Sequence, residues 1–114
     1  MDLKLQLTED KTILFEQHVN FKDSVSAKLK LDNGYSASII TKKSLEDNSG
    51  ILHSAQGSWD DETFELAVLD EKESFIQVDE LNQDVEYSMN YGVWTSLSKK
   101  DLLEKIQIIS NLKR

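Results

Sequence analysis

The strongest structural signal in this sequence is an alternation of apolar and polar residues that leads into an Asn-Gly pair. Within residues 25–31 (VSAKLKL) every second residue is apolar, a pattern typical of a strand with one buried face. Asn33-Gly34 follows almost at once and favours a tight hairpin turn. Residues 35–40 then return as the partner strand. The chain is therefore expected to be built on an antiparallel sheet.

Further strands are predicted along the rest of the chain. The segment 63–69 (TFELAVL) ends in consecutive apolar residues, which indicates a central strand that is covered on both faces. Shorter alternations predict strands at 3–7 and 85–91, and further strands are expected at 12–15 and 74–78. Residues 42–58 are expected to form a long polar excursion, 70–73 a turn, 79–84 a loop and 92–96 a second turn.

A helix is predicted near the C-terminus. Ser98 is a favourable N-cap, and Asp101, three residues later, suits the positive end of a helix. The apolar residues of 102–112 fall on one stripe. The sequence thus predicts an α+β fold, in which an antiparallel sheet of about five strands carries one C-terminal helix on a face. Residues 1–114 are expected to form a single compact domain.

The absence of cysteine limits both the chemistry and the compartment. Disulfides, thiolate zinc sites and cysteine nucleophiles are excluded. A small secreted domain more often carries disulfides, so a cytoplasmic location is expected. The residues after Met1 lack the basic and apolar regions of a signal peptide. No apolar run is long enough to span a membrane.

No motif points to catalysis or to a cofactor. His18 and His53 stand in polar surroundings, and neither has a nucleophile-elbow sequence nearby. The acids 60–62 lack the spacing of a calcium-binding loop, and the four glycines are too scattered to cradle a phosphate. We therefore expect a protein that is not an enzyme and that has no metal or cofactor, with a small hydrolase as a remote alternative.

The charge distribution is the most unusual feature of the composition. Of the net charge of −8, residues 60–86 contribute eleven acids against Lys72 alone, whereas residues 87–114 carry five basic residues against two acids. A net negative chain is repelled by nucleic acid and by anionic membranes, so direct binding to either is not expected. A negative surface would instead attract a basic protein surface at a high association rate.

Candidate partner-binding residues come from this acidic segment. An exposed tryptophan beside it would be an interface anchor, although packing at the edge of the core is the favoured interpretation for Trp59 and Trp94 alike. A purely solubilising role for the acids is the competing interpretation. The candidate contact residues are Trp59, Asp60, Asp61, Glu62, Glu65, Glu71 and Glu73.

Three segments resemble a family of small proteins from phages and other mobile elements of bacteria. Residues 33–40 (NGYSASII) are similar to the family's NGYxASVI strand, and 57–69 to its GSYG…FEVAVL segment. Residues 92–103 are similar to the approach to the family's final helix. The chain departs from the pattern at Asp60, where the family has glycine. The resemblance implies a compact α+β domain in a mobile-element context, and no active site.

Together these observations predict a small acidic protein-binding domain. The favoured function is that of a phage or mobile-element accessory protein that binds, and inhibits, a nucleic-acid-handling defence protein of the host, as an anti-CRISPR protein does. The alternative is a bacterial immunity or antitoxin-like protein that neutralises a toxin. In both cases the partner is a protein with a basic surface, and the sequence leaves the oligomeric state open.

Overall fold

The computed structural model describes residues 3–8, 11–20, 24–42, 51–52 and 64–113. Its strands form a single sheet in the order β5-β1-β2-β3-β4-β6-β7, and β8 also pairs with β6. All described pairings are antiparallel except that of β1 with β5. The strands are β1 Leu3–Thr8, β2 Lys11–Gln17, β3 Ser24–Lys30, β4 Ser36–Lys42, β5 Ile51–Leu52, β6 Phe64–Leu69, β7 Phe75–Ile76 and β8 Val93–Leu97.

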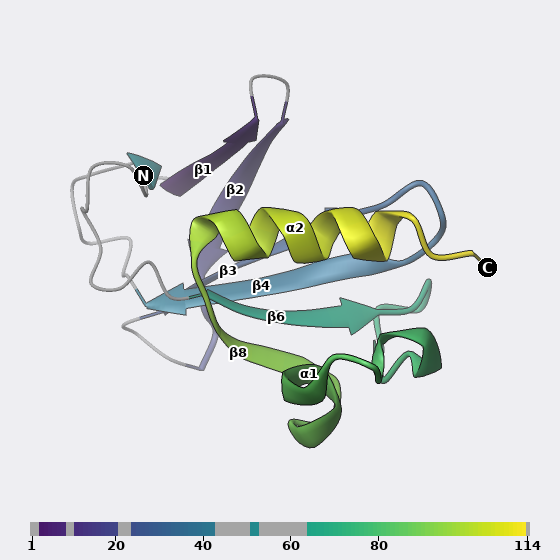
Figure 1. Ribbon diagram of the computed structural model, residues 1–114. Helices are drawn as coiled ribbons and strands as arrows, with labels where there is room; N and C mark the ends of the chain where they lie inside the picture. The colour runs from purple at the N-terminus through teal and green to yellow at the C-terminus, as the bar shows by residue number, and fades with distance from the viewer. Residues whose placement is uncertain (1–2, 9–10, 21–23, 43–50, 53–63, 114) are drawn as a thin grey trace.

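The helix α2 (Lys99–Ser110) lies across one face of this sheet, as Figure 1 shows. This is the predicted α+β architecture. The predicted cap is confirmed, because the Ser98 hydroxyl accepts the backbone N–H of Asp101 at 3.1 Å. The buried residues of the helix are Leu102, Ile106 and Ile109, which belong to the predicted stripe.

The core lies between α2 and the sheet strands β2, β3, β4, β6 and β8. Ala27 of β3 is opposite Ile39 of β4, Ile39 is opposite Leu66 of β6, and Leu66 is opposite Trp94 of β8. Directly opposed residues share a face of the sheet, and these four side chains are all buried. The prediction that Trp94 packs in the core is confirmed.

Strand β6 is central, as predicted. It pairs with β4 along one edge and with both β7 and β8 along the other. Five of its six residues are buried, and only Glu65 is exposed. Consecutive buried residues on a strand require cover on both faces. Between β7 and β8 the chain leaves this edge of β6, and it returns to the same edge as β8.

The predicted hairpin joins β3 and β4, but its turn is of a different type. Lys30 is opposite Ser36. The N–H of Leu31 donates to the carbonyl of Tyr35, and the N–H of Gly34 donates to the carbonyl of Leu31. These bonds close a three-residue loop in which Gly34 has a φ of +93°. The result is a type I turn followed by a left-handed glycine, not a two-residue Asn-Gly turn.

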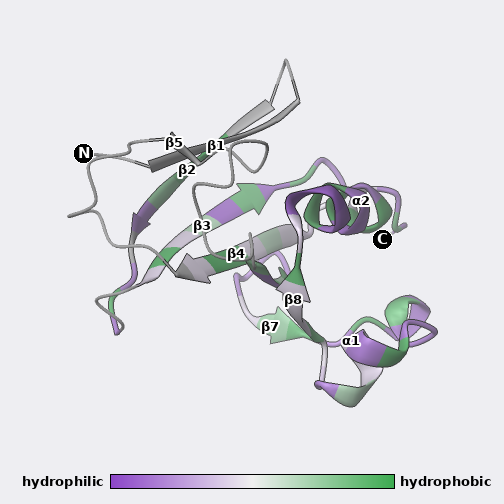
Figure 2. Cartoon of the chain, turned by 60° about the vertical axis from the view of Figure 1, so that its left-hand side comes forward, coloured by the Kyte–Doolittle hydropathy of each residue, from purple (hydrophilic) through white to green (hydrophobic). Residues whose placement is uncertain are grey.

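Two segment predictions near the C-terminus were wrong. Residues 85–91 were predicted to be a strand, but they contain the helix α1 (Val85–Met89). Residues 92–96 were predicted to be a turn, but they belong largely to β8. The predicted loop at 79–84 contains the short 3-10 helix η3 (Asp79–Leu81). The turned view of Figure 2 shows α1 and α2 at opposite ends of β8.

Candidate functional site

The structure describes three of the seven candidate contact residues. Trp59, Asp60, Asp61 and Glu62 lie outside the described residues. Glu65 is exposed near the start of β6, and Glu71 and Glu73 are exposed in the loop that follows this strand. Because a strand rises about 3.3 Å per residue, Glu65 lies at the other end of β6 from these two. The structure does not bring the three carboxylates into one cluster.

Several acids of the segment have partners within the chain. One carboxylate oxygen of Asp70 accepts the backbone N–H groups of Lys72 and Ser74, which closes the loop between β6 and β7. Glu86 accepts the N–H of Thr95 at 3.1 Å and thereby occupies a backbone donor of β8. Side-chain acceptors of this kind stabilise turns and strand edges. These two acids support the local structure.

Asp84 has the most extensive set of contacts. Its Oδ1 atom accepts the backbone N–H of Tyr87 at 3.2 Å and so caps the N-terminus of α1. Its Oδ2 atom accepts Nε1–H of Trp94 at 3.1 Å and Nζ–H of Lys105 at 2.9 Å. One carboxylate therefore joins α1, β8 and α2. We call Asp84, Trp94 and Lys105 the Asp84 anchor.

The environment of the Asp84 anchor shifts the pKa of both charged groups. Burial is the largest influence on the pKa of Asp84 and raises it, but the hydrogen bonds from Lys105, Trp94 and Tyr87 together outweigh burial and lower this pKa. The hydrogen bond to Asp84 raises the pKa of Lys105, against a smaller effect of burial. Both groups are therefore held in their charged forms, with their side chains 28% and 21% exposed.

Tyr87 provides the second attachment of α1. Its side chain is fully buried, and its hydroxyl accepts the backbone N–H of Val78 at 2.7 Å. Burial raises the pKa of this hydroxyl, so it stays neutral at physiological pH. The ring lies 4.6 Å, centroid to centroid, from that of Trp94. These contacts explain how a helix of five residues, too short to be stable alone, keeps its position.

A hollow lies between the β3–β4 and β6–β7 loops. It has a volume of about 430 Å³ and is open to solvent. Two lysines and two glutamates carry opposite charges around it, so the hollow does not select either sign of ligand charge. The Oε1 atom of Glu73 also lies 3.6 Å from the Nζ atom of Lys28, which forms an exposed ion pair. The lining residues are Lys30, Leu31, Gly34, Tyr35, Ser36, Glu71, Lys72 and Glu73.

Neither a catalytic cluster nor a metal site emerges from the described part of the chain. His18 is partly exposed, and its Nδ1 atom accepts the N–H of Asn20 at 3.0 Å, as in a local turn. His53 lies outside the described residues. Among the residues described, no group of three His, Cys, Asp or Glu side chains is placed to hold a metal ion. Within the same residues, no helix is long and apolar enough to cross a membrane.

Sequence reasoning counted Asp84 and Glu86 only as part of the acidic segment and missed their contacts. The available signal was the order of residues from Asp84 to Gly92: an N-cap acid, an acid in the first turn, and a glycine after the last turn. Lys105 shows no sequence signal of its contact, yet it is partly buried, with its Nζ atom 5.7 Å from the centroid of the Trp94 ring. Contacts between residues so far apart in sequence leave no local signal.

Comparison with known proteins identified no relative: no family model, no curated protein and no solved structure matches this chain.

Proposed function

We propose that this protein is a non-enzymatic binding domain whose acidic segment docks on a basic surface of another protein. The supporting observation is the set of exposed acids on either side of β7. Glu71 and Glu73 precede this strand, Asp79 and Glu80 follow it, and all four side chains are exposed. Lys72 is the one basic residue between positions 64 and 98. Such an excess of negative charge favours a cationic partner and speeds the encounter with it.

The partner class follows from the same electrostatics. Proteins that hold nucleic acid present basic surfaces, so a host nuclease or another nucleic-acid-handling protein is the favoured partner. In this proposal the domain inhibits its partner by occupying the surface that otherwise holds phosphates. The resemblance to mobile-element proteins agrees with an anti-defence role of this kind. An immunity protein directed at a toxin is the alternative, and it is distinguished by its partner.

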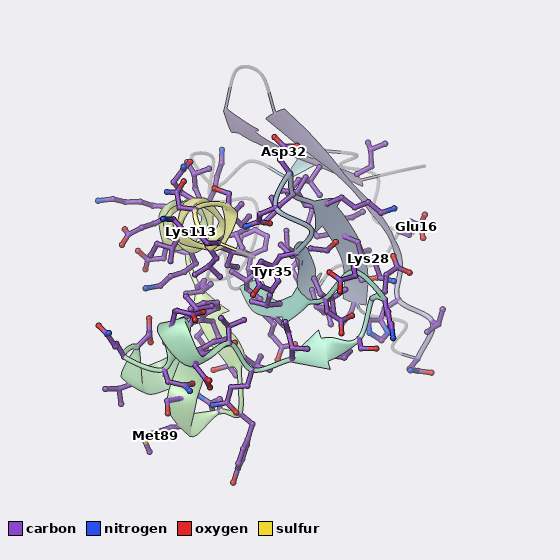
Figure 3. All side chains as sticks on the ribbon, turned by 90° about the vertical axis from the view of Figure 1, so that its right-hand side faces the viewer. Glu16, Lys28, Asp32, Tyr35, Met89 and Lys113 are labelled. Atoms are coloured by element: carbon purple, nitrogen blue, oxygen red, sulfur yellow. The ribbon has the colours of Figure 1, made fainter. Side chains whose placement is uncertain are left out.

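The test is capture of bacterial proteins on the immobilised domain, with elution in steps of rising salt and identification by mass spectrometry. The test variant is Asp79→Lys/Glu80→Lys, and the matched control is Glu16→Lys/Asp32→Lys, which makes the same change of charge. Figure 3 shows Glu16 and Asp32 far from Met89 of α1. All four residues are exposed, so neither variant should disturb the core.

We expect a basic protein that elutes at moderate salt, and we expect the domain and DNA to compete for binding to it. The Asp79→Lys/Glu80→Lys variant should lose it, and the control variant should keep it. A single toxin, retained to high salt and indifferent to DNA, would instead support the immunity function. The proposal fails if no basic protein is captured, or if both variants capture it equally.

A further inference from the structure

We infer that the outer face of α1 is the apolar centre of the interface, and that it packs against a cationic amphipathic segment of the partner protein. This inference rests on the proposed function, because it requires a basic partner. It adds a contact surface that lies outside the residues predicted from the sequence. The surface consists of Val85, Met89 and Tyr91, and we call it the α1 face.

The α1 face is exposed although its residues are apolar. Val85 and Met89 are one turn apart on α1 and are 68% and 73% exposed, and Tyr91 directly after the helix is 87% exposed. Residues four apart lie on the same side of a helix. Figure 3 shows Met89 at the edge of the molecule, directed away from the sheet. Methionine and tyrosine are among the residues enriched in protein interfaces.

The α1 face is also held in place. The Asp84 anchor fixes the start of the helix, and the buried Tyr87 holds its middle. Glu86 adds a bond to Thr95 of β8. A surface that is already ordered loses little conformational entropy on binding. The helix is therefore suited to present its outer side chains to a partner without rearranging.

Tyr91 adopts a backbone conformation that favours glycine. It has a φ of +57° at the position directly after the helix cap. The N–H of Gly92 donates to the carbonyl of Tyr87 at 2.8 Å, and the N–H of Tyr91 donates to the carbonyl of Ser88 at 3.4 Å. This is a Schellman motif, in which glycine is usual at the left-handed position. The ring of Tyr91 is exposed, so core packing does not account for a tyrosine here.

Charge identifies the kind of partner. Residues 79–92 have no basic residue, and although Asp84 is paired with Lys105, Asp79 and Glu80 are exposed. A second copy of this acidic segment would therefore be repelled. A partner segment with apolar side chains flanked by lysine or arginine would fill the α1 face and be attracted by the exposed acids Asp79 and Glu80.

The test uses the ¹⁵N-labelled protein and two synthetic peptides. One is an amphipathic Lys/Leu peptide, and the other is a Lys/Ser peptide of equal length and charge. We expect the Lys/Leu peptide to shift the amide signals of Val85, Met89 and Tyr91 and to bind more tightly than the Lys/Ser peptide. Equal binding of the two peptides, or shifts confined to other surfaces, would overturn the inference.

Variants separate this inference from the proposed function. Tyr91→Gly should raise the unfolding midpoint, because it relieves the left-handed strain, and should weaken binding of the Lys/Leu peptide about tenfold, as loss of an interface anchor does. Met89→Ser should weaken this binding similarly. Val19→Ser, at a position 92% exposed elsewhere on the chain, is the matched control and should leave binding unchanged.

The same variants of the domain are then immobilised, and each is tested for capture of the partner protein from the lysate. If Asp79→Lys/Glu80→Lys loses this partner but Tyr91→Gly and Met89→Ser keep it, the proposed function stands and the α1 face is refuted. If the α1-face variants lose the partner and the charge variant keeps it, the cationic partner is refuted, and the proposed function fails with it. Loss with both sets of variants supports both proposals.

Discussion

Replacing Asp84 with asparagine tests whether one carboxylate holds α1, β8 and α2 together. Asparagine is also a good N-cap, so one oxygen still accepts the N–H of Tyr87. Its NH₂ group cannot accept the bonds that Oδ2 receives from Trp94 at 3.1 Å and from Lys105 at 2.9 Å. The substitution therefore removes the charge and these two bonds while it keeps the cap.

The expected loss follows from these contacts. A hydrogen bond to a charged group contributes about 1.5–3 kcal/mol, and removal of one partner leaves the other without compensation for its burial. The two bonds share one oxygen and the ion pair is partly exposed, so water compensates part of their loss and together they should cost about as much as one such bond. We expect Asp84→Asn to lower the free energy of unfolding by about 2 kcal/mol. Asp84→Ala also removes the cap and should cost about 1 kcal/mol more.

The assay is urea denaturation followed by far-ultraviolet circular dichroism. The control is Lys105→Met, which keeps an apolar stem over Trp94 and leaves Asp84 bonded to Tyr87 and Trp94, so it should cost less than Asp84→Asn. In Asp84→Asn, amide exchange should accelerate at Tyr87 more than at Leu102. A change of less than about 0.5 kcal/mol, the range of neutral surface substitutions, would refute the role given to this carboxylate.

Three further predictions concern pH and two turns. Because the pKa of Asp84 is lowered and that of Lys105 raised, the stability difference between wild type and Asp84→Asn should be full between about pH 3.9 and 10.4, and should shrink in more acidic or alkaline solution as either group loses its charge. Denaturation curves across this range measure it, and a difference that already shrinks well above pH 3.9 would contradict the lowered pKa of Asp84. Asn33→Asp should lower the free energy of unfolding by about 2 kcal/mol at neutral pH. The Nδ2 atom of Asn33 donates to the carbonyls of Ile109 at 2.8 Å and Leu112 at 2.9 Å, and a carboxylate cannot donate these bonds. Thermal unfolding tests this, and an unchanged midpoint would exclude it. Glu73→Gly should be about 1 kcal/mol more stable than Glu73→Ala, because Glu73 has a φ of +61°, which glycine adopts without strain. Both variants lose the weak ion pair with Lys28, so the comparison isolates the backbone effect. Equal denaturation midpoints would show that this turn stores no strain.

The elements that were predicted correctly are those with an unambiguous local signal. The β3–β4 hairpin has a sustained alternation and a glycine in its turn, and α2 has a capping serine and more than two turns of apolar stripe. In both elements the local preference and the tertiary packing agree. Burial of β6 on both faces could also be inferred, because a run of apolar residues has no polar side to expose.

The exchange of helix and strand between residues 85 and 97 has a physical cause. A helix of five residues buries only Tyr87, so its sequence shows no helical period and the alternation of 85–91 was misleading. In β8 the buried residues Trp94 and Leu97 are three positions apart, because the strand has an extra residue relative to the Leu66 and Phe64 positions opposite them. A bulge of this kind removes the alternation by which a strand is predicted.

The candidate site was only partly predictable for a related reason. Composition identified the acidic segment, but it did not separate the acids that have internal partners from the exposed ones. Asp84 is separated from Lys105 by 21 positions and from Trp94 by 10, so the pattern around Asp84 does not reveal these contacts. The α1 face depends on which side of a short helix is held down, and this follows from the position of Tyr87 in the fold.

The bonds from Asn33 to the end of α2 have a consequence for the order of folding. Asn33 and Leu112 are 79 residues apart, and closing a loop of that length costs about 4 kcal/mol of chain entropy. The hairpin needs only local contacts to form, so it should be complete before the last turn of the helix is capped. A substitution that removes the Nδ2 donor but keeps the oxygen that accepts the N–H of Tyr35, such as Asn33→Asp, should therefore speed unfolding while it leaves the folding rate nearly unchanged. The bonds between the turn and the end of α2 are therefore expected to form after the folding transition state.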